Sequence, residues 1–170
     1  MSCSDCPKEE TSQSSFSPGT VQSHEDIAFA LIEPDTFQKG LISLSRTRLK
    51  KEGVSVCRAN LCTASYAQEK VLAEQFTRDS SRQDHGVAWL ACKEIRDIKL
   101  LEAKTNNPTD TRGFCVVDDA YENYQEHAHV QFANHPETWM QNARNAAFGT
   151  LYLKLRNAPR ASWNDGPFKK

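Results

Sequence analysis

Short apolar runs, separated by polar or turn-forming residues, constrain the fold of this chain more than any other feature of its sequence. The first run, residues 27–32, is a continuous apolar stretch that Pro34 stops soon afterwards. Runs of this length suit buried β-strands, because helices usually need a longer pattern and a proline disfavours helical conformation in the residue before it. Similar or alternating patterns predict further strands at residues 41–45, 54–58, 87–91, 114–117 and 127–132.

Two stretches have helical periodicity instead. Ser65 and Gln68 have the spacing of a capping box, which predicts a helix that begins near Ser65. Pro136 suits the first turn of a longer helix over residues 136–157. Too few helices separate the strands for a doubly wound parallel fold, so we predict an α+β fold: a small mixed or mainly antiparallel sheet packed by one long C-terminal helix and one shorter helix. The apolar stripes are Ala67, Val71, Leu72 and Phe76 in the shorter helix, and Met140, Ala143, Ala147, Leu151 and Leu155 in the longer one.

Composition divides the chain into three parts. Residues 1–24 are rich in Ser, Thr, Gln, Glu and Pro, which predicts a disordered N-terminal tail because such a segment buries little apolar surface. Residues 159–170 contain two prolines and a basic end, and we expect a flexible C-terminal tail from which Trp163 and Phe168 can dock onto the body. Residues 25–158 are expected to form a single α+β domain.

The charge balance excludes several classes of protein. The chain has 21 Lys and Arg against 22 Asp and Glu, so its formal net charge is -1. This balance argues against a strongly basic nucleic-acid binder and gives no electrostatic attraction to an anionic membrane. No stretch has the roughly 18 consecutive apolar residues of a membrane span, and the first residues do not have the pattern of a secretory signal. We therefore expect a small soluble, cytoplasmic protein without a nucleic-acid or membrane partner.

The six cysteines are expected to be reduced. A chain of this length without an export signal is not a disulfide scaffold, although the number of cysteines is even. Cys57, Cys92 and Cys115 lie inside apolar runs, where a thiol behaves as a small hydrophobic side chain. The sequence thus predicts free thiols and no structural bridge.

The strand at residues 127–132 carries the most distinctive group of polar side chains. His127 and His129 share one face of the strand with Gln131, while the alternate residues form an apolar face that must meet the core. Two imidazoles at this spacing can reach one metal ion, such as zinc, and an upstream carboxylate can complete the site. They can instead hold a phosphate or act as general acid and base, since imidazole titrates near neutrality. The structural alternative is that they form the polar face of a half-exposed strand. Candidate catalytic residues are Glu126, His127 and His129, of which the two histidines are the candidate metal ligands.

Other residues suggest a ligand-binding site. Tyr121 and Tyr124 lie in an acidic connection between two strands, where a tyrosine ring can stack on a ligand while its hydroxyl makes a hydrogen bond. Arg46 and Arg58 lie close to strand-like runs that also carry serines, and arginine binds phosphate or carboxylate groups through two parallel hydrogen bonds. These four residues are the candidate ligand-binding residues, each with the alternative of an ordinary surface role.

The order of elements resembles the ADP-ribosyltransferase-like folds in outline. The resemblance rests on Lys39-Gly-Leu-Ile-Ser-Leu-Ser-Arg, on Val54-Ser-Val-Cys-Arg-Ala, on the helix from Ser65 and on Gly86-Val-Ala-Trp-Leu. It spans about residues 27–132 and implies an NAD cofactor in the cleft of a split antiparallel sheet. The nearest residue to the family's Gln/Glu-x-Glu motif is Glu126.

Two functions of different class follow. The sequence contains neither the common dinucleotide, phosphate-loop and zinc-protease motifs nor the serine-hydrolase motif. We therefore expect a binding or regulatory domain for a protein partner or a small ligand. The alternative is an enzyme that uses the strand of His127 and His129, either as a metal-assisted hydrolase with zinc or as an NAD-consuming transferase.

Overall fold

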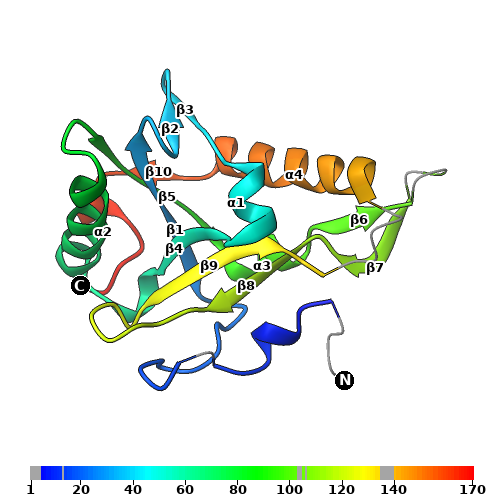
Figure 1. Ribbon diagram of the computed structural model, residues 1–170, viewed down its shortest axis with the longest axis horizontal. Coiled ribbons are helices and arrows are strands. Elements are labelled where there is room, and N and C mark those ends of the chain that lie inside the picture. The colour runs from blue at the N-terminus through cyan, green and yellow to red at the C-terminus, as the bar shows by residue number, and fades with distance from the viewer. Residues whose placement is uncertain (1–4, 13, 103–104, 106, 135–139) are drawn as a thin grey trace.

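A six-stranded sheet forms the centre of the protein. The computed structural model describes residues 5–12, 14–102, 105, 107–134 and 140–170 (Figure 1). The strands lie in the order β10-β5-β1-β4-β9-β8, and each neighbouring pair is antiparallel. With its helices this is an α+β fold with a mainly antiparallel sheet, as the sequence predicts. The strands are β1 (Asp26–Glu33), β4 (Val54–Arg58), β5 (Gln83–Ala91), β8 (Phe114–Asp118), β9 (His127–Phe132) and β10 (Arg160–Ala161).

Helices pack on both faces of this sheet. The long helix α4 (Met140–Asn157) contributes to the larger core, and α2 (Ala64–Arg78) contributes to a smaller core on the opposite face. In the described part of the chain, no helix combines the length and apolar character that a membrane span needs. The remaining elements are α1 (Arg46–Lys51), α3 (Cys92–Arg96), the two-stranded pairs β2 (Phe37–Gln38) with β3 (Leu41–Ile42) and β6 (Lys99–Leu101) with β7 (Pro108–Arg112), and the 3-10 turns η1 (Pro7–Glu9), η2 (Ala59–Leu61) and η4 (Trp163–Asp165).

Strand β1 separates the two cores by the alternation of its side chains. Ile27, Phe29 and Leu31 are at most 2% exposed and belong to the core that α4 covers. Ala28 and Ala30 point to the other face, toward α2. Because alanine side chains are short, they leave space between the sheet and α2 that larger side chains would fill. This space becomes the cleft described below.

The predicted long helix is present, and its apolar stripe faces the core. Ala143, Ala147, Leu151 and Leu155 are all at most 6% exposed, as the helical spacing predicts. The predicted start at Pro136 lies outside the described residues. Leu153, between two of the buried positions, is 59% exposed, which is consistent with a helix that presents one face to the sheet.

Helix α2 begins earlier than the sequence predicts. Thr63 is its N-cap, and the Thr63 hydroxyl accepts a hydrogen bond from the backbone N–H of Tyr66. The predicted cap at Ser65 is therefore wrong, because Thr63 satisfies an orphan donor of the first turn. The apolar stripe is also shorter than predicted: Ala67 is fully buried, whereas Phe76 near the end of α2 is 38% exposed.

The N-terminal segment differs from the disordered tail expected at residues 1–24. Its described residues pass along β8 (Figure 1), and Cys6 forms a disulfide bond with Cys115 of that strand. The prediction of wholly reduced cysteines is therefore wrong, because the fold brings together two cysteines far apart in the sequence. The Glu9 carboxylate is anchored to Arg96 at 3.3 Å and to Arg112 at 2.6 Å. Ion pairs thus hold a polar segment whose composition indicates little apolar burial.

The C-terminal segment also packs onto the body. Arg160 and Ala161 pair with β5, and the chain then returns beside α2 (Figure 1). Trp163 and Phe168 are 3% and 9% exposed in the smaller core, so the two aromatic residues dock as the sequence allows. The segment at residues 159–170 therefore closes one end of the α2 face, where a flexible tail was expected.

Candidate functional site

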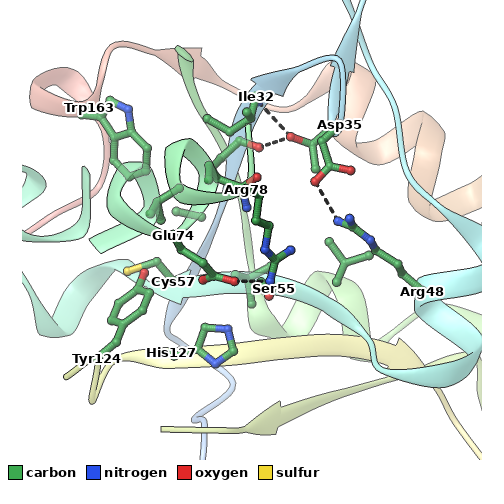
Figure 2. A pocket seen from close by; sticks show the side chains of 17 residues that line it. Ile32, Asp35, Arg48, Ser55, Cys57, Glu74, Arg78, Tyr124, His127 and Trp163 are labelled. Atoms are coloured by element: carbon green, nitrogen blue, oxygen red, sulfur yellow. Dashed lines mark hydrogen bonds and ion pairs between the residues drawn. The ribbon is translucent and has the colours of Figure 1, made fainter. Parts of the chain in front are cut away.

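A cleft lies between α2 and the sheet. It has a volume of about 50 Å³, and Figure 2 shows the side chains that line it. Its floor is mainly apolar, and polar side chains converge on it from β4, β9 and α2. This volume holds a few water-sized groups, since one water needs roughly 10–15 Å³ on such a scale. The polar and aromatic lining residues are Asp35, Thr36, Arg48, Ser55, Cys57, Glu74, Gln75, Arg78, Tyr124, His127 and Trp163.

His127 lies on the floor of this cleft with its ring orientation set by a backbone contact. It is 6% exposed, and its Nδ1 lies 2.9 Å from the carbonyl oxygen of Asp119. A carbonyl oxygen can only accept a hydrogen bond, so Nδ1 carries the hydrogen and Nε2 keeps a lone pair when the ring is neutral. No described residue is hydrogen-bonded to Nε2. His127 lines the cleft, and Figure 2 shows its ring below the ion pair of Glu74 with Arg78.

Two tyrosine rings pack around His127. The centroids of the Tyr124 and Tyr121 rings lie 5.5 and 5.2 Å from that of the imidazole. Tyr124 is buried, and burial raises the pKa of its hydroxyl well above the ordinary value, with a further contribution from neighbouring Cys57. Tyr121 is 41% exposed, and partial burial raises its pKa to about 12. Both hydroxyls therefore stay protonated at neutral pH and can donate hydrogen bonds.

Ion pairs stand at the mouth of the cleft. A nitrogen of Arg48 lies 2.7 Å from a carboxylate oxygen of Asp35. Within α2, a nitrogen of Arg78 lies 2.6 Å from a carboxylate oxygen of Glu74, one helical turn earlier. The two arginine side chains are 37% and 52% exposed, so each can reorient in solvent. Since each cation has an acidic partner, the mouth offers polar contacts without a strong net charge.

His129 shares the strand face of His127 but has different surroundings. Its Nδ1 lies 3.3 Å from a carboxylate oxygen of Asp119, and its Nε2 lies 3.1 Å from the Gln131 side chain. Its ring packs on Gly53, where a Cβ atom would come within 2.5 Å of the imidazole. Burial lowers the pKa of His129, and the Asp119 carboxylate opposes that shift. His129 therefore belongs to a packed polar cluster outside the lining of the cleft.

The two histidines do not form a metal cluster in the described structure. The one described group of His, Cys, Asp or Glu side chains close enough to share an ion is Cys6, Glu9 and Cys115. Its two sulfur atoms are joined in the disulfide bond, which removes them as thiolate ligands. The Nδ1 atoms of His127 and His129 lie 3.6 and 3.3 Å from the same carboxylate oxygen of Asp119, so the two rings share an acidic neighbour without forming such a cluster.

Neither a protein-family model, a curated protein nor a solved structure matches the chain. The arrangement of its own residues is therefore the basis for assigning a function. Among the predicted site residues, the structure brings together His127, Tyr124 and Tyr121. His127 and Tyr124 line the cleft, and Arg48, which is outside the predicted set, lines it as well.

Besides His129, three predicted residues lie outside the cleft. Arg58 is buried in ion pairs with Glu25 and Asp118, which leaves it no free face for a ligand. Arg46 is in α1, where its guanidinium lies 4.7 Å from the centre of the Phe148 ring. Glu126 lines a shallow groove on the other side of α2's first turn, away from the cleft.

Several cleft residues were missed by sequence reasoning. Glu74 and Arg78 have the i,i+4 spacing of a helical ion pair, a signal that the sequence offered. Asp35 follows a cis Glu33–Pro34 peptide bond in the turn after β1, and nothing in its sequence context points to the cleft. The contribution of Trp163 depends on the path of the C-terminal segment, which short-range patterns do not encode.

Proposed function

We propose that this chain is a binding domain whose small ligand enters the cleft between α2 and the sheet. The observation that carries the proposal is that His127 lines the cleft with its Nδ1 held by the Asp119 carbonyl, while its Nε2 has no hydrogen-bond partner among the described residues. Ligand sites commonly combine an apolar lining with a few convergent polar groups. The placement of Tyr124 and His127 in one cleft supports this proposal over a surface role for either residue.

The ligand class follows from these contacts. A neutral imidazole with hydrogen on Nδ1 accepts a hydrogen bond at Nε2, so the ligand carries an N–H or O–H donor. The small apolar floor favours a compact ring or alkyl group beside that donor. A polar end can reach Arg48 or Arg78 at the mouth, since both side chains are partly exposed.

Pyrazole and 1-methylpyrazole provide a matched test, because only the first has a ring N–H. We expect pyrazole to shift the His127 ring nitrogen signals in a two-bond ¹H–¹⁵N NMR spectrum. 1-Methylpyrazole should bind several-fold more weakly, because one net hydrogen bond contributes about 1 kcal/mol. The His127→Phe variant should lose the preference, whereas His24→Phe, at an exposed histidine, should keep it. Equal affinity for both probes, or no response of His127 to either, would exclude this ligand class.

A second candidate function is catalysis with His127 as general base. The contact from Nδ1 to the Asp119 carbonyl favours it, because a base must be held in one orientation with its other nitrogen facing the substrate. In this function Nε2 takes a proton from a water or hydroxyl that attacks a bound carbonyl. Hydrolysis of 4-nitrophenyl acetate above the buffer rate should be lost in His127→Phe and kept in His24→Phe. Equal rates of hydrolysis in His127→Phe and His24→Phe would exclude His127 as the general base of this reaction.

The metal-assisted form of that enzyme has a separate test. A melting curve with zinc, with chelator and with neither should show a rise in Tm with zinc only if His127 and His129 bind it. The His127→Ala/His129→Ala double variant is the control, and it should remove any zinc-dependent rise. The same Tm in all three conditions would exclude zinc and leave the metal-free base.

A further inference from the structure

Cys57 and Cys62 are in direct contact inside the protein. Their sulfur atoms lie 3.3 Å apart, and the residues are 2% and 5% exposed. A disulfide bond is about 2.05 Å long, so the sulfurs need to approach by about 1.3 Å. We propose that Cys57 and Cys62 are a reversible dithiol–disulfide pair. They would form a second disulfide bond in addition to that of Cys6 with Cys115.

The backbone holds both cysteines in place. Cys57 lies in β4, where it pairs in register with His127 of β9. Cys62 ends the 3-10 turn η2: its N–H donates to the Ala59 carbonyl, and its carbonyl accepts from the N–H of Lys169 at 2.9 Å. The short path between the two cysteines therefore keeps their side chains together, and closure of the bond requires side-chain rotation with little movement of the sheet.

The pair is reachable from two sides. Cys57 lines the cleft, and Figure 2 shows its sulfur directed toward the Tyr124 hydroxyl. Cys62 lines the shallow groove that also contains Tyr66, Glu126 and Lys169. The hydrogen bond that the Cys62 thiol makes to the Cys57 sulfur and burial raise the pKa of Cys62, so thiolate is scarce and exchange should be slow at neutral pH.

The reaction is thiol–disulfide exchange with a small-molecule disulfide. One protein thiolate attacks the small disulfide, forms a mixed disulfide and releases one small thiolate. The second protein thiolate then attacks the protein sulfur of that mixed disulfide and releases the other. Two protein S–H bonds and one small-molecule S–S bond are replaced by one protein S–S bond and two small thiols, which take up the two protons. The resulting disulfide bond joins Cys57 of β4 to Cys62, the residue immediately before the N-cap Thr63 of α2.

Cys92 is a natural internal control. It is the remaining free cysteine of the described residues and is fully buried in the larger core, where burial raises its pKa to about 12. If the thiols were oxidised only after the whole protein unfolds, Cys92 would be exposed and modified as well. A reaction of the Cys57–Cys62 pair leaves Cys92 reduced.

Mapping the thiols of the full chain tests the proposal. The protein is equilibrated in buffers of graded reduced and oxidised glutathione, quenched in acid, alkylated under denaturing conditions and digested with trypsin. Cleavage at Lys51, Arg58 and Lys70 places the two cysteines on separate peptides, 52–58 and 59–70, which only a disulfide can join. We expect the joined peptide to replace both alkylated peptides in parallel, while the Cys92 peptide, 83–93, stays alkylated.

Variants separate the pair from the rest of the chain. Cys57→Ala should abolish the joined peptide and Cys92→Ala should retain it. The peptide analysis of the protein without substitutions decides the question even if Cys57→Ala fails to fold. The proposal is overturned if both peptides stay separately alkylated at every glutathione ratio, or if they carry glutathione without becoming joined.

Discussion

Arg58 and Glu25 form a two-pronged ion pair inside the protein. The Arg58 Nε and one terminal nitrogen each lie 2.7 Å from a different carboxylate oxygen of Glu25. The other terminal nitrogen lies 3.3 Å from Asp118 at the end of β8, and both nitrogens donate to carbonyls of Gly19 and Thr20. One arginine thereby ties the N-terminal segment to the end of the sheet.

Removing this arginine should destabilise the protein strongly. Arg58→Met leaves two carboxylates buried without their cation, and breaking a buried pair in this way costs about 3–5 kcal/mol. Urea unfolding measures the loss. Lys93→Ala is the control, because the ion pair of Lys93 with Asp97 is mostly exposed and such pairs contribute about 0–1 kcal/mol. Similar losses in the two variants would contradict a structural role of Arg58.

Helix α4 provides a matched pair of leucines. Leu151 is fully buried, whereas Leu153, on the same helix, is 59% exposed. Leu151→Ala should lower the free energy of unfolding by about 2–5 kcal/mol through lost burial and the cavity left behind. Leu153→Ala should change it by at most about 0.5 kcal/mol. Denaturant titration of both variants checks this, and a larger loss at Leu153 would mean that α4 presents its other face to the sheet.

The tautomer of His127 is a direct prediction of its contact with Asp119. Because the Asp119 carbonyl accepts from Nδ1, neutral His127 should carry its hydrogen on Nδ1. The two-bond ¹H–¹⁵N spectrum distinguishes the two tautomers by the shifts of the ring nitrogens. His24, which is exposed, gives a reference signal from the same chain. A hydrogen on Nε2 of His127 would remove the acceptor that the proposed ligand requires.

Stability should fall as the pH drops through the range in which histidine titrates. Burial lowers the pKa of folded His129 below its ordinary 6.5, with Asp119 and Gln131 opposing and His127 adding to the shift. Between the folded pKa and 6.5 the unfolded chain binds more protons, so the free energy of unfolding rises with pH there and this contribution is lost on acidification. The slope from one such group is at most about 1.4 kcal/mol per pH unit.

Replacing His129 isolates that contribution. His129→Gln should flatten the dependence of the unfolding free energy on pH between pH 5 and 7, a range chosen around the ordinary pKa of about 6.5. His24→Gln changes an exposed histidine and should leave the slope as it is. An unchanged slope in His129→Gln would assign the acid sensitivity to another group.

The local patterns predicted most of the sheet and its two faces. The alternation in β9 places Ala128 and Val130 in the core, fully buried, with His127 and His129 on the opposite face. Side chains alternate in every strand, so this division follows from the sequence alone once the strand is recognised. His127 of this strand and Tyr124 of the acidic connection before it were candidate site residues from the sequence, but the cleft that both line was not predicted.

What the sequence determined by itself is the set of elements and the direction of their apolar faces, because periods of 2 and 3.6 residues are properties of neighbouring side chains. The tertiary structure alone decided which distant residues meet. Arg58 is placed beside Glu25 instead of a ligand, Cys6 reaches Cys115, and Trp163 returns to the wall of the cleft. These contacts depend on strand order and on the paths of the two ends of the chain, which the packing of the whole sheet determines.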